Sequence, residues 1–199
     1  QITELDRNAK IASPISGVTN WAIKRGNRLT RPLMEAIAGV HKDANLPVFT
    51  NKSFKKRTPA PVQGKNSRKV VLYATCFVNH NNPQIGEAAQ AIFSKNGIET
   101  EVVYPSCCGM PQLEQGDIAR VAENAKKISL ELAPWIDKGY DIVALVPSCA
   151  LMLKFEWPLI LPDDKNIMRL SKATFDIAEY VVDIAKKEGL VEGLNKIDG

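Results

Sequence analysis

The fold is decided by three stretches of sequence: VVLYATC at residues 70–76, IETEVVYPSCC at residues 98–108 and DIVALVPSC at residues 141–149. The first and third join a short apolar run to cysteine just beyond its end, and the second leads to its cysteines from the mixed run IETEVVY. Continuous apolar runs of this length are typical of strands buried on both faces of a parallel sheet. We therefore expect strands at 70–74, 98–104 and 141–146.

Amphipathic helices are expected after these strands. The first opens with Asn82–Pro83 and ends at Gly97, because proline suits the first turn of a helix and glycine follows its end. The second begins at Asp117 and is kinked or shortened at Pro134. The third runs over residues 171–188, with Phe175 on its buried face. Strands that alternate with helices indicate right-handed βαβ units. The predicted fold class is α/β, a parallel sheet with helices on both faces.

The cysteines follow the predicted strands. Cys76 comes two residues after the first strand, Cys107 and Cys108 come shortly after the second, and Cys149 comes three residues after the third. All strands of a parallel sheet end at the same edge, where ligands usually bind. The sequence therefore predicts that four thiols from three loops meet at one rim of the sheet.

Four convergent thiols suit either an iron–sulfur cluster or a tetrahedral zinc ion. Zinc sites usually draw ligands in CxxC pairs, whereas Cys107 and Cys108 are adjacent and direct their side chains apart in extended backbone. This spacing favours a cluster, which offers several metal positions. Gly109 is also a candidate, because its missing Cβ lets backbone approach a bulky group; an ordinary turn glycine is the alternative. Backbone N–H groups at a helix starting near Ser148 would stabilise a Cys149 thiolate.

Charge divides the chain into two parts. Residues 1–69 carry 14 Lys/Arg against 4 Asp/Glu, whereas residues 70–199 carry 12 against 18. We expect a basic helical arm and linker at 1–68, with the linker over 51–69, and a cysteine-rich domain at 69–199. Helices are expected in the arm from Ser13–Pro14 and from Thr30. Their apolar faces favour packing on a neighbouring domain over lying on a membrane surface, and the linker is either solvated or a site for an anionic partner.

The pattern Cys76, Cys107–Cys108–Gly109 and Cys149 resembles the CCG cysteine-rich domain found in heterodisulfide reductase (its B-type chain) and in related proteins. ATCFVNHNNPQIGEAAQ (74–90), CCGMPQLEQGD (107–117) and PSCALMLKFEWP (147–158) are similar to the first such module of anaerobic glycerol-3-phosphate dehydrogenase C-type subunits. The resemblance covers nearly the whole chain. It implies a central fragment, without the ferredoxin domain and the second CCG module that such subunits carry.

One position departs from the family pattern. The full motif ends in CxxC, and Met152 stands where its last cysteine would be. The noncubane cluster that the complete motif holds is therefore less expected than a [4Fe–4S] cluster on Cys76, Cys107, Cys108 and Cys149. We interpret Met152 as a core residue and His80 as a loop histidine with ordinary hydrogen bonds. Neither His41 nor His80 belongs to a catalytic triad.

The resemblance implies a non-catalytic electron-transfer subunit of an oxidoreductase. It would relay electrons from flavoprotein dehydrogenase subunits towards quinone, in the cytoplasm on the inner face of the cell membrane, without nucleic acid. The sequence contains no apolar run of about 18 residues that would span a bilayer. Two alternatives stay open: disulfide catalysis at the cluster, as in heterodisulfide reductase, and a metal-free thiol sensor with a reversible disulfide such as Cys76–Cys107. The G-x-G-x-x-G pattern of dinucleotide-binding domains is absent after the first strand.

Overall fold

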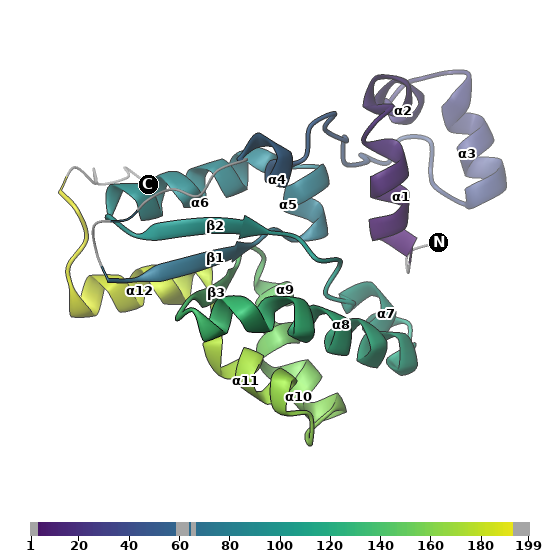
Figure 1. Cartoon of the computed structure of the whole chain (residues 1–199). Coiled ribbons are helices and arrows are strands. Elements are labelled where there is room, and N and C mark those ends of the chain that lie inside the picture. The colour runs from purple at the N-terminus through teal and green to yellow at the C-terminus, as the bar shows by residue number, and fades with distance from the viewer. Residues whose placement is uncertain (1–3, 59–63, 65–66, 193–199) are drawn as a thin grey trace.

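A four-stranded parallel sheet forms the centre of the molecule (Figure 1). The structure is a computed structural model and describes residues 4–58, 64 and 67–192. The strands stand in the order β2-β1-β3-β4, so β1 and β3 lie in the middle. The strands are β1 (Lys69–Tyr73), β2 (Glu99–Val103), β3 (Asp141–Ala144) and β4 (Thr174–Asp176).

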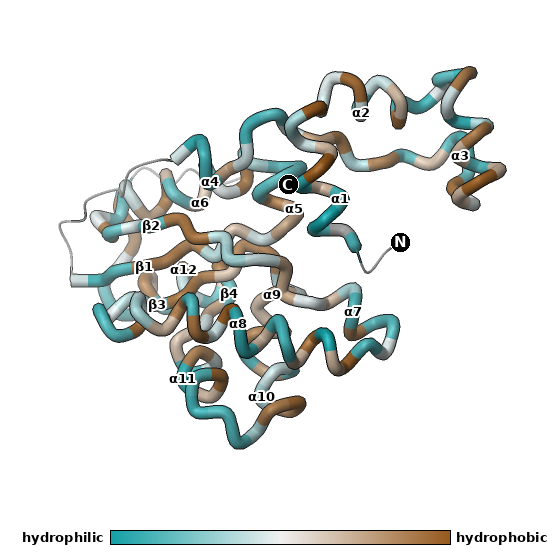
Figure 2. The backbone as a smooth tube through the Cα atoms, turned by 45° about the vertical axis from the view of Figure 1, so that its right-hand side comes forward, coloured by the Kyte–Doolittle hydropathy of each residue, from teal (hydrophilic) through white to brown (hydrophobic). Residues whose placement is uncertain are grey.

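Helices cover both faces of the sheet, and this confirms the predicted fold class. One face packs against α6 (Pro83–Lys95) and α12 (Ile177–Lys187), and the other against α8 (Ile118–Asp137) and α11 (Lys165–Ala173). Adjacent strand residues alternate between the two cores: Val71 and Tyr73 face α8, whereas Val70 and Leu72 face α6. Figure 2 shows the apolar strands running through the middle of the domain. The continuous apolar runs therefore reflect burial from two sides.

Short helices carry the chain away from the strand ends. They are α5 (Cys76–His80), α7 (Met110–Glu114), α9 (Pro147–Leu151), the π-helix η2 (Met152–Glu156) and α10 (Trp157–Ile160). The predicted helix starts are confirmed at Asn82, which precedes Pro83 in the first turn of α6, and at Asp117, whose carboxylate accepts the N–H of Arg120 at 3.3 Å. Helix α8 continues through Pro134 to Asp137.

The helix predicted over residues 171–188 is wrong in its first part. Two helices occupy this region, separated by β4, and Phe175 lies in that strand. The chain leaves the strand at Asp176, which forms a capping box with Glu179 and so begins α12. The apolar spacing of residues 171–188 also fits a single helix. The sequence therefore did not reveal the three-residue strand or the capping box that follows it.

The basic arm contains α1 (Leu5–Ala12), α2 (Ser16–Ile23), α3 (Thr30–Ala38) and α4 (Phe54–Arg57). The start at Thr30 is confirmed. The start at Ser13–Pro14 is wrong, because α2 begins at Ser16 and the N–H of Ser13 instead bonds to the Ala9 carbonyl at the end of α1.

The apolar faces of α2 and α3 do not pack on the rest of the chain, contrary to our expectation. Trp21 is 54% exposed and Ile37 is 76% exposed. The linker prediction for residues 51–69 is also wrong at its start, because Phe54 in α4 is fully buried against Gly86. Residues 59–63 and 65–66 of that stretch lie outside the described residues.

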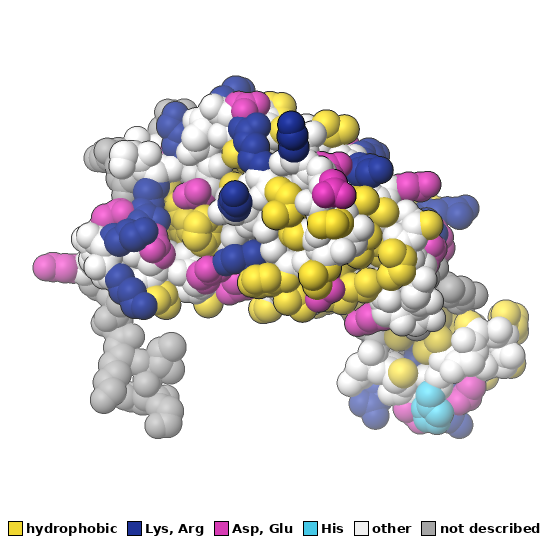
Figure 3. Space-filling model, turned by 90° about the horizontal axis from the view of Figure 1, so that it is seen from below, with side chains coloured by type: hydrophobic (Ala, Val, Ile, Leu, Met, Phe, Trp, Pro, Cys, Tyr) yellow, Lys and Arg dark blue, Asp and Glu magenta, His cyan; other side chains and the backbone are white. Residues whose placement is uncertain are grey.

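A second exposed apolar surface lies on the underside of the domain. Figure 3 shows hydrophobic side chains gathered there. Between α9 and α10, Leu151, Phe155 and Leu159 are exposed, Leu159 to 76%. Within the described part of the chain, no helix has the length and hydropathy to cross a bilayer.

Candidate functional site

The end of β1 places Cys76 at the start of a helix. Thr75 adopts an extended conformation, and its hydroxyl accepts the N–H of Val78 at 3.3 Å, so that it caps α5. Threonine is a favoured capping residue because its oxygen satisfies an N–H that the helix leaves unpaired. Cys76 is the first residue of α5 and is partly exposed, whereas Cys107, Cys108 and Cys149 are buried.

Two hydrogen bonds from buried aromatic side chains hold the loop that carries Cys107 and Cys108. The phenol of Tyr73, at the end of β1, donates to the Ser106 carbonyl at 2.6 Å. The indole N–H of Trp157, in α10, donates to the Cys108 carbonyl at 3.2 Å. Both aromatic side chains are fully buried. One bond comes from β1 and the other from α10, and together they hold the adjacent cysteines in position.

Cys149 lies in α9, three residues after the end of the apolar run at 141–146. Helix α9 begins at Pro147, one residue before Ser148, and follows Val146 in extended conformation. The N–H of Cys149 donates to the Val146 carbonyl at 2.9 Å. The predicted helix start is therefore displaced by one residue.

The four sulfur atoms form two close pairs at the carboxyl edge of the sheet. Sγ of Cys76 lies 3.7 Å from Sγ of Cys107, and Sγ of Cys108 lies 3.2 Å from Sγ of Cys149. Cys107 and Cys108 are adjacent in the chain, so the two pairs lie next to each other. Disulfide sulfurs lie about 2.05 Å apart, and all four cysteines are free. The predicted convergence of three loops is present in the structure.

These contacts shift the pKa values of the thiols in opposite directions. The pKa of Cys107 is held well below its usual range because the thiols of Cys108 and Cys76 donate hydrogen bonds to its sulfur. The pKa values of Cys76 and Cys108 are raised, first by these hydrogen bonds to Cys107. Burial of both thiols raises these pKa values further. These hydrogen bonds therefore favour ionisation at Cys107 over Cys76 and Cys108, and a thiolate is the form that binds metal.

Gly109 is required by its backbone conformation. Its φ of 90° lies in the left-handed region, where side chains other than hydrogen are unfavourable. A Cβ at this position would meet Val121 at 3.6 Å and Met152 at 3.8 Å, which are ordinary contacts on the side of the core. This geometry is typical of a turn glycine, which changes the direction of the chain after Cys108. Met152 itself is fully buried, as expected for a core residue.

His80 is buried with both ring nitrogens in hydrogen bonds, as expected for a structural histidine. Its Nδ1 lies 3.1 Å from the Ser13 hydroxyl, and its Nε2 lies 3.2 Å from the Asn79 amide nitrogen. Burial lowers its pKa; the charge of Asp6 opposes this effect, and the charges of Lys10 and Lys56 add to it. His41 is exposed and lies in the arm, away from the cysteines.

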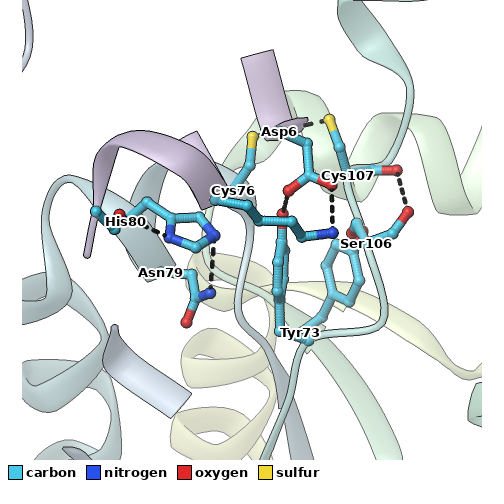
Figure 4. Close-up of polar contacts among 10 residues, drawn as sticks. Asp6, Tyr73, Cys76, Asn79, His80, Ser106 and Cys107 are labelled. Carbon is cyan, nitrogen blue, oxygen red and sulfur yellow. Dashed lines mark hydrogen bonds and ion pairs between the residues drawn. The ribbon is translucent and has the colours of Figure 1, made fainter. Parts of the chain in front are cut away.

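Helix α1 lies against the cysteine edge, and sequence reasoning missed it. Figure 4 shows Asp6 beside Cys76 and Cys107. The Asp6 carboxylate accepts a hydrogen bond from the buried phenol of Tyr104 and pairs with Lys10 at 2.8 Å. The Asp6–Lys10 spacing of four residues is a recognised helix signal, but nothing in the sequence pairs Asp6 with a tyrosine 98 positions away.

The donor set of the site consists of thiols alone. Among the described residues, no three His, Cys, Asp or Glu side chains are arranged to hold one metal ion. The four thiols nevertheless lie together in two hydrogen-bonded pairs, Cys76 with Cys107 and Cys108 with Cys149. Thiolates are the ordinary ligands of iron–sulfur clusters, so the chemistry of the site suits such a group.

Comparison with known proteins agrees with this arrangement. Residues 70–154 match the family model for the cysteine-rich (CCG) domain. The C-type subunit of anaerobic glycerol-3-phosphate dehydrogenase from Escherichia coli (strain K12) is 25% identical over 173 residues, which cover 84% of this chain and 43% of that protein. Lactate utilization protein A from Bacillus thuringiensis (strain Al Hakam) is 28% identical over 125 residues, which cover 59% of this chain and 49% of that protein.

The chain thus spans less than half the length of these relatives. No solved structure matches it. The matched segment runs from β1 to η2 and includes all four cysteines and the Gly109 turn. The chain therefore contains a CCG cysteine-rich domain and is a distant relative of these two proteins.

Proposed function

We propose that this chain is an electron-transfer module that holds an iron–sulfur cluster on Cys76, Cys107, Cys108 and Cys149. The observation that carries the proposal is the two close pairs of free thiols that three separate loops bring to one edge of the sheet. A bound cluster would supply one-electron redox chemistry at this edge. Four thiol ligands and a Met152 that belongs to the core favour a [4Fe–4S] cluster.

The surrounding residues would position the ligands and limit access of water. Tyr73 and Trp157 hold the loop of Cys107 and Cys108 by hydrogen bonds to the carbonyls of Ser106 and Cys108. The Cys107 thiolate is stabilised by hydrogen bonds from the neighbouring thiols. Cys76, which is partly exposed, lies on the side from which electrons would enter or leave. Burial and hydrogen bonding of this kind are the means by which a protein sets a cluster potential.

We further propose that the module works next to other subunits. One relative is named as a dehydrogenase subunit, and the exposed apolar side chains of Phe155 and Leu159 suit a surface that another subunit covers. In this proposal, flavoprotein subunits supply the electrons and quinone at the inner face of the cell membrane receives them. The exposed apolar residues of α2 and α3 lie beside Lys24 and Arg25, as on surfaces that contact anionic membranes.

Anaerobic reconstitution tests the proposal. The chain is incubated with ferrous iron and sulfide, desalted, and measured by visible absorption and EPR before and after dithionite. We expect broad absorption that bleaches on reduction and returns on oxidation, with an EPR signal in one state only. A folded chain that takes up no iron would overturn the proposal.

The sulfur distances favour a second candidate function, a metal-free thiol switch. The pairs Cys76–Cys107 and Cys108–Cys149 are close enough to form disulfides after small movements. Oxidation of each pair would release two protons and pass two electrons to a disulfide oxidant such as oxidised glutathione. Counting free thiols after incubation in glutathione buffers of known potential tests this candidate. Reversible loss of two or four thiols from the iron-free chain supports it, whereas four thiols at every potential exclude it.

A further inference from the structure

A cavity of about 320 Å³ lies beside the cysteine site, between α1, α4 and α5. Lys10 and Ser13 line it from the arm, Lys56 lines it from α4, and His80 and Tyr104 line it from the domain. The proposed electron-transfer function uses none of these side chains as ligands. Its walls are made by segments far apart in the sequence, and three of its polar residues are more than nine-tenths buried: Ser13, Asn79 and His80.

The hydrogen bonds of the cavity wall leave one hydroxyl hydrogen, that of Ser13, without an acceptor among them. Oδ1 of Asn79 accepts the N–H of Lys55 at 3.1 Å, so its amide nitrogen donates to Nε2 of His80. Because Nε2 is the acceptor, Nδ1 of the neutral ring carries the proton and donates to the Ser13 hydroxyl. The hydroxyl hydrogen of Ser13 is then available to a ligand. The wall therefore offers an O–H donor whose orientation is set by a buried network.

The charge around the cavity is positive. Lys10 and Lys56 contribute two ammonium groups, and Asp6 is the carboxylate that faces them, paired with Lys10 at 2.8 Å and with the phenol of Tyr104. Lys10 also lies over the Tyr104 ring, 5.7 Å from its centroid. Lysine binds oxyanions as a point charge, and hydrogen bonds from charged donors are among the strongest in proteins.

We propose that this cavity binds a small oxyanion, a carboxylate or phosphate group, held by Lys10, Lys56 and Ser13. A volume of about 320 Å³ lies at the lower end of the range of small-molecule sites. The bound group would lie next to Tyr104, which contacts Asp6, and Asp6 lies beside Cys76 and Cys107 (Figure 4). The site is thus adjacent to the thiols but separate from them.

Titration of the ¹⁵N-labelled, iron-free chain followed by NMR tests the proposal. Potassium phosphate and potassium acetate are added in separate experiments, with potassium chloride at equal ionic strength as the reference. We expect saturable shifts of the α1, α4 and α5 amides with at least one oxyanion. Phosphate-only saturation indicates a phosphate site, and acetate-only saturation indicates a carboxylate site. Shifts equal to those in chloride would overturn the proposal.

Matched lysine variants locate the binding. Lys10→Gln and Lys56→Gln should each weaken it about tenfold, the effect of one charge-assisted hydrogen bond. Lys126→Gln, at an exposed position of α8, should leave it unchanged, and Lys56→Arg should retain most of it. Urea unfolding of each variant checks the fold. Equal affinity in all the variants, or equal weakening by Lys126→Gln, would contradict a site in this cavity.

Discussion

Replacing Gly109 by alanine should destabilise the domain through the backbone alone. The residue has a φ of 90°, a conformation that costs an ordinary L-residue about 1–2 kcal/mol. A Cβ would meet Val121 no closer than 3.6 Å, so steric overlap adds nothing. Alanine also restricts the unfolded chain, which stabilises the folded state by about 0.4–1 kcal/mol. The net loss for Gly109→Ala is therefore about 1 kcal/mol.

Gly17 offers a matched control. It lies in α2 without positive φ, and a Cβ there would meet nothing within 4 Å. Gly17→Ala keeps the effect on the unfolded chain and lacks the backbone strain, so it should stabilise by about 0.4–1 kcal/mol. The two variants should then differ by about 1–2 kcal/mol, the strain at Gly109.

Urea unfolding followed by circular dichroism measures this difference. With a slope of about 2 kcal/mol per molar urea, the midpoints of the two variants should be about 0.5–1 M apart. The slopes themselves should be equal to that of the wild type. A Gly109→Ala protein as stable as Gly17→Ala would show that the turn after Cys108 does not need a left-handed residue, and the reasoning would be wrong.

Three further predictions follow from single contacts. Gly86→Ala should lower the free energy of unfolding by about 1–3 kcal/mol, because its Cβ would lie 2.5 Å from the buried ring of Phe54; urea unfolding measures this, and a neutral result contradicts the packing. Tyr73→Phe should cost about 1–2 kcal/mol by leaving the Ser106 carbonyl without its donor; an unchanged midpoint would refute that bond. His80 has a pKa below its ordinary value of 6.5. The folded state thus binds fewer protons, and stability should fall as pH drops below about 6.5 towards the lowered pKa. His80→Gln should remove this component of the pH dependence, and an unaltered profile would contradict it.

The sequence was sufficient for three of the four strands and for the meeting of the cysteines. The apolar runs at 70–74 and 141–146 indicate strands that are buried on both faces of a sheet. Parallel strands then bring the loops that follow them to one edge. Capping residues such as Asp117 and Pro83 mark helix starts locally. Both kinds of inference rest on physical rules that act over a few residues.

The missed features depend on contacts between distant segments. Helix α4 lies in a lysine-rich stretch whose composition indicates a linker, yet the single buried ring of Phe54 anchors it against α6. Strand β4 has three residues and acquires its identity by pairing with β3. The position of α1 over the cysteine edge relies on the bond between Asp6 and Tyr104. No local periodicity contains this information.

Iron and acid-labile sulfide, counted per chain after anaerobic reconstitution, test the central claim most directly. Serine is placed at Cys76, Cys107, Cys108 and Cys149 in turn, with Met152→Leu as the control in the core. We predict about four irons and four sulfides in the wild type, a large loss in every serine variant, and retention in Met152→Leu. Serine variants that keep the iron content of the wild type would show that the four thiols do not act as one ligand set.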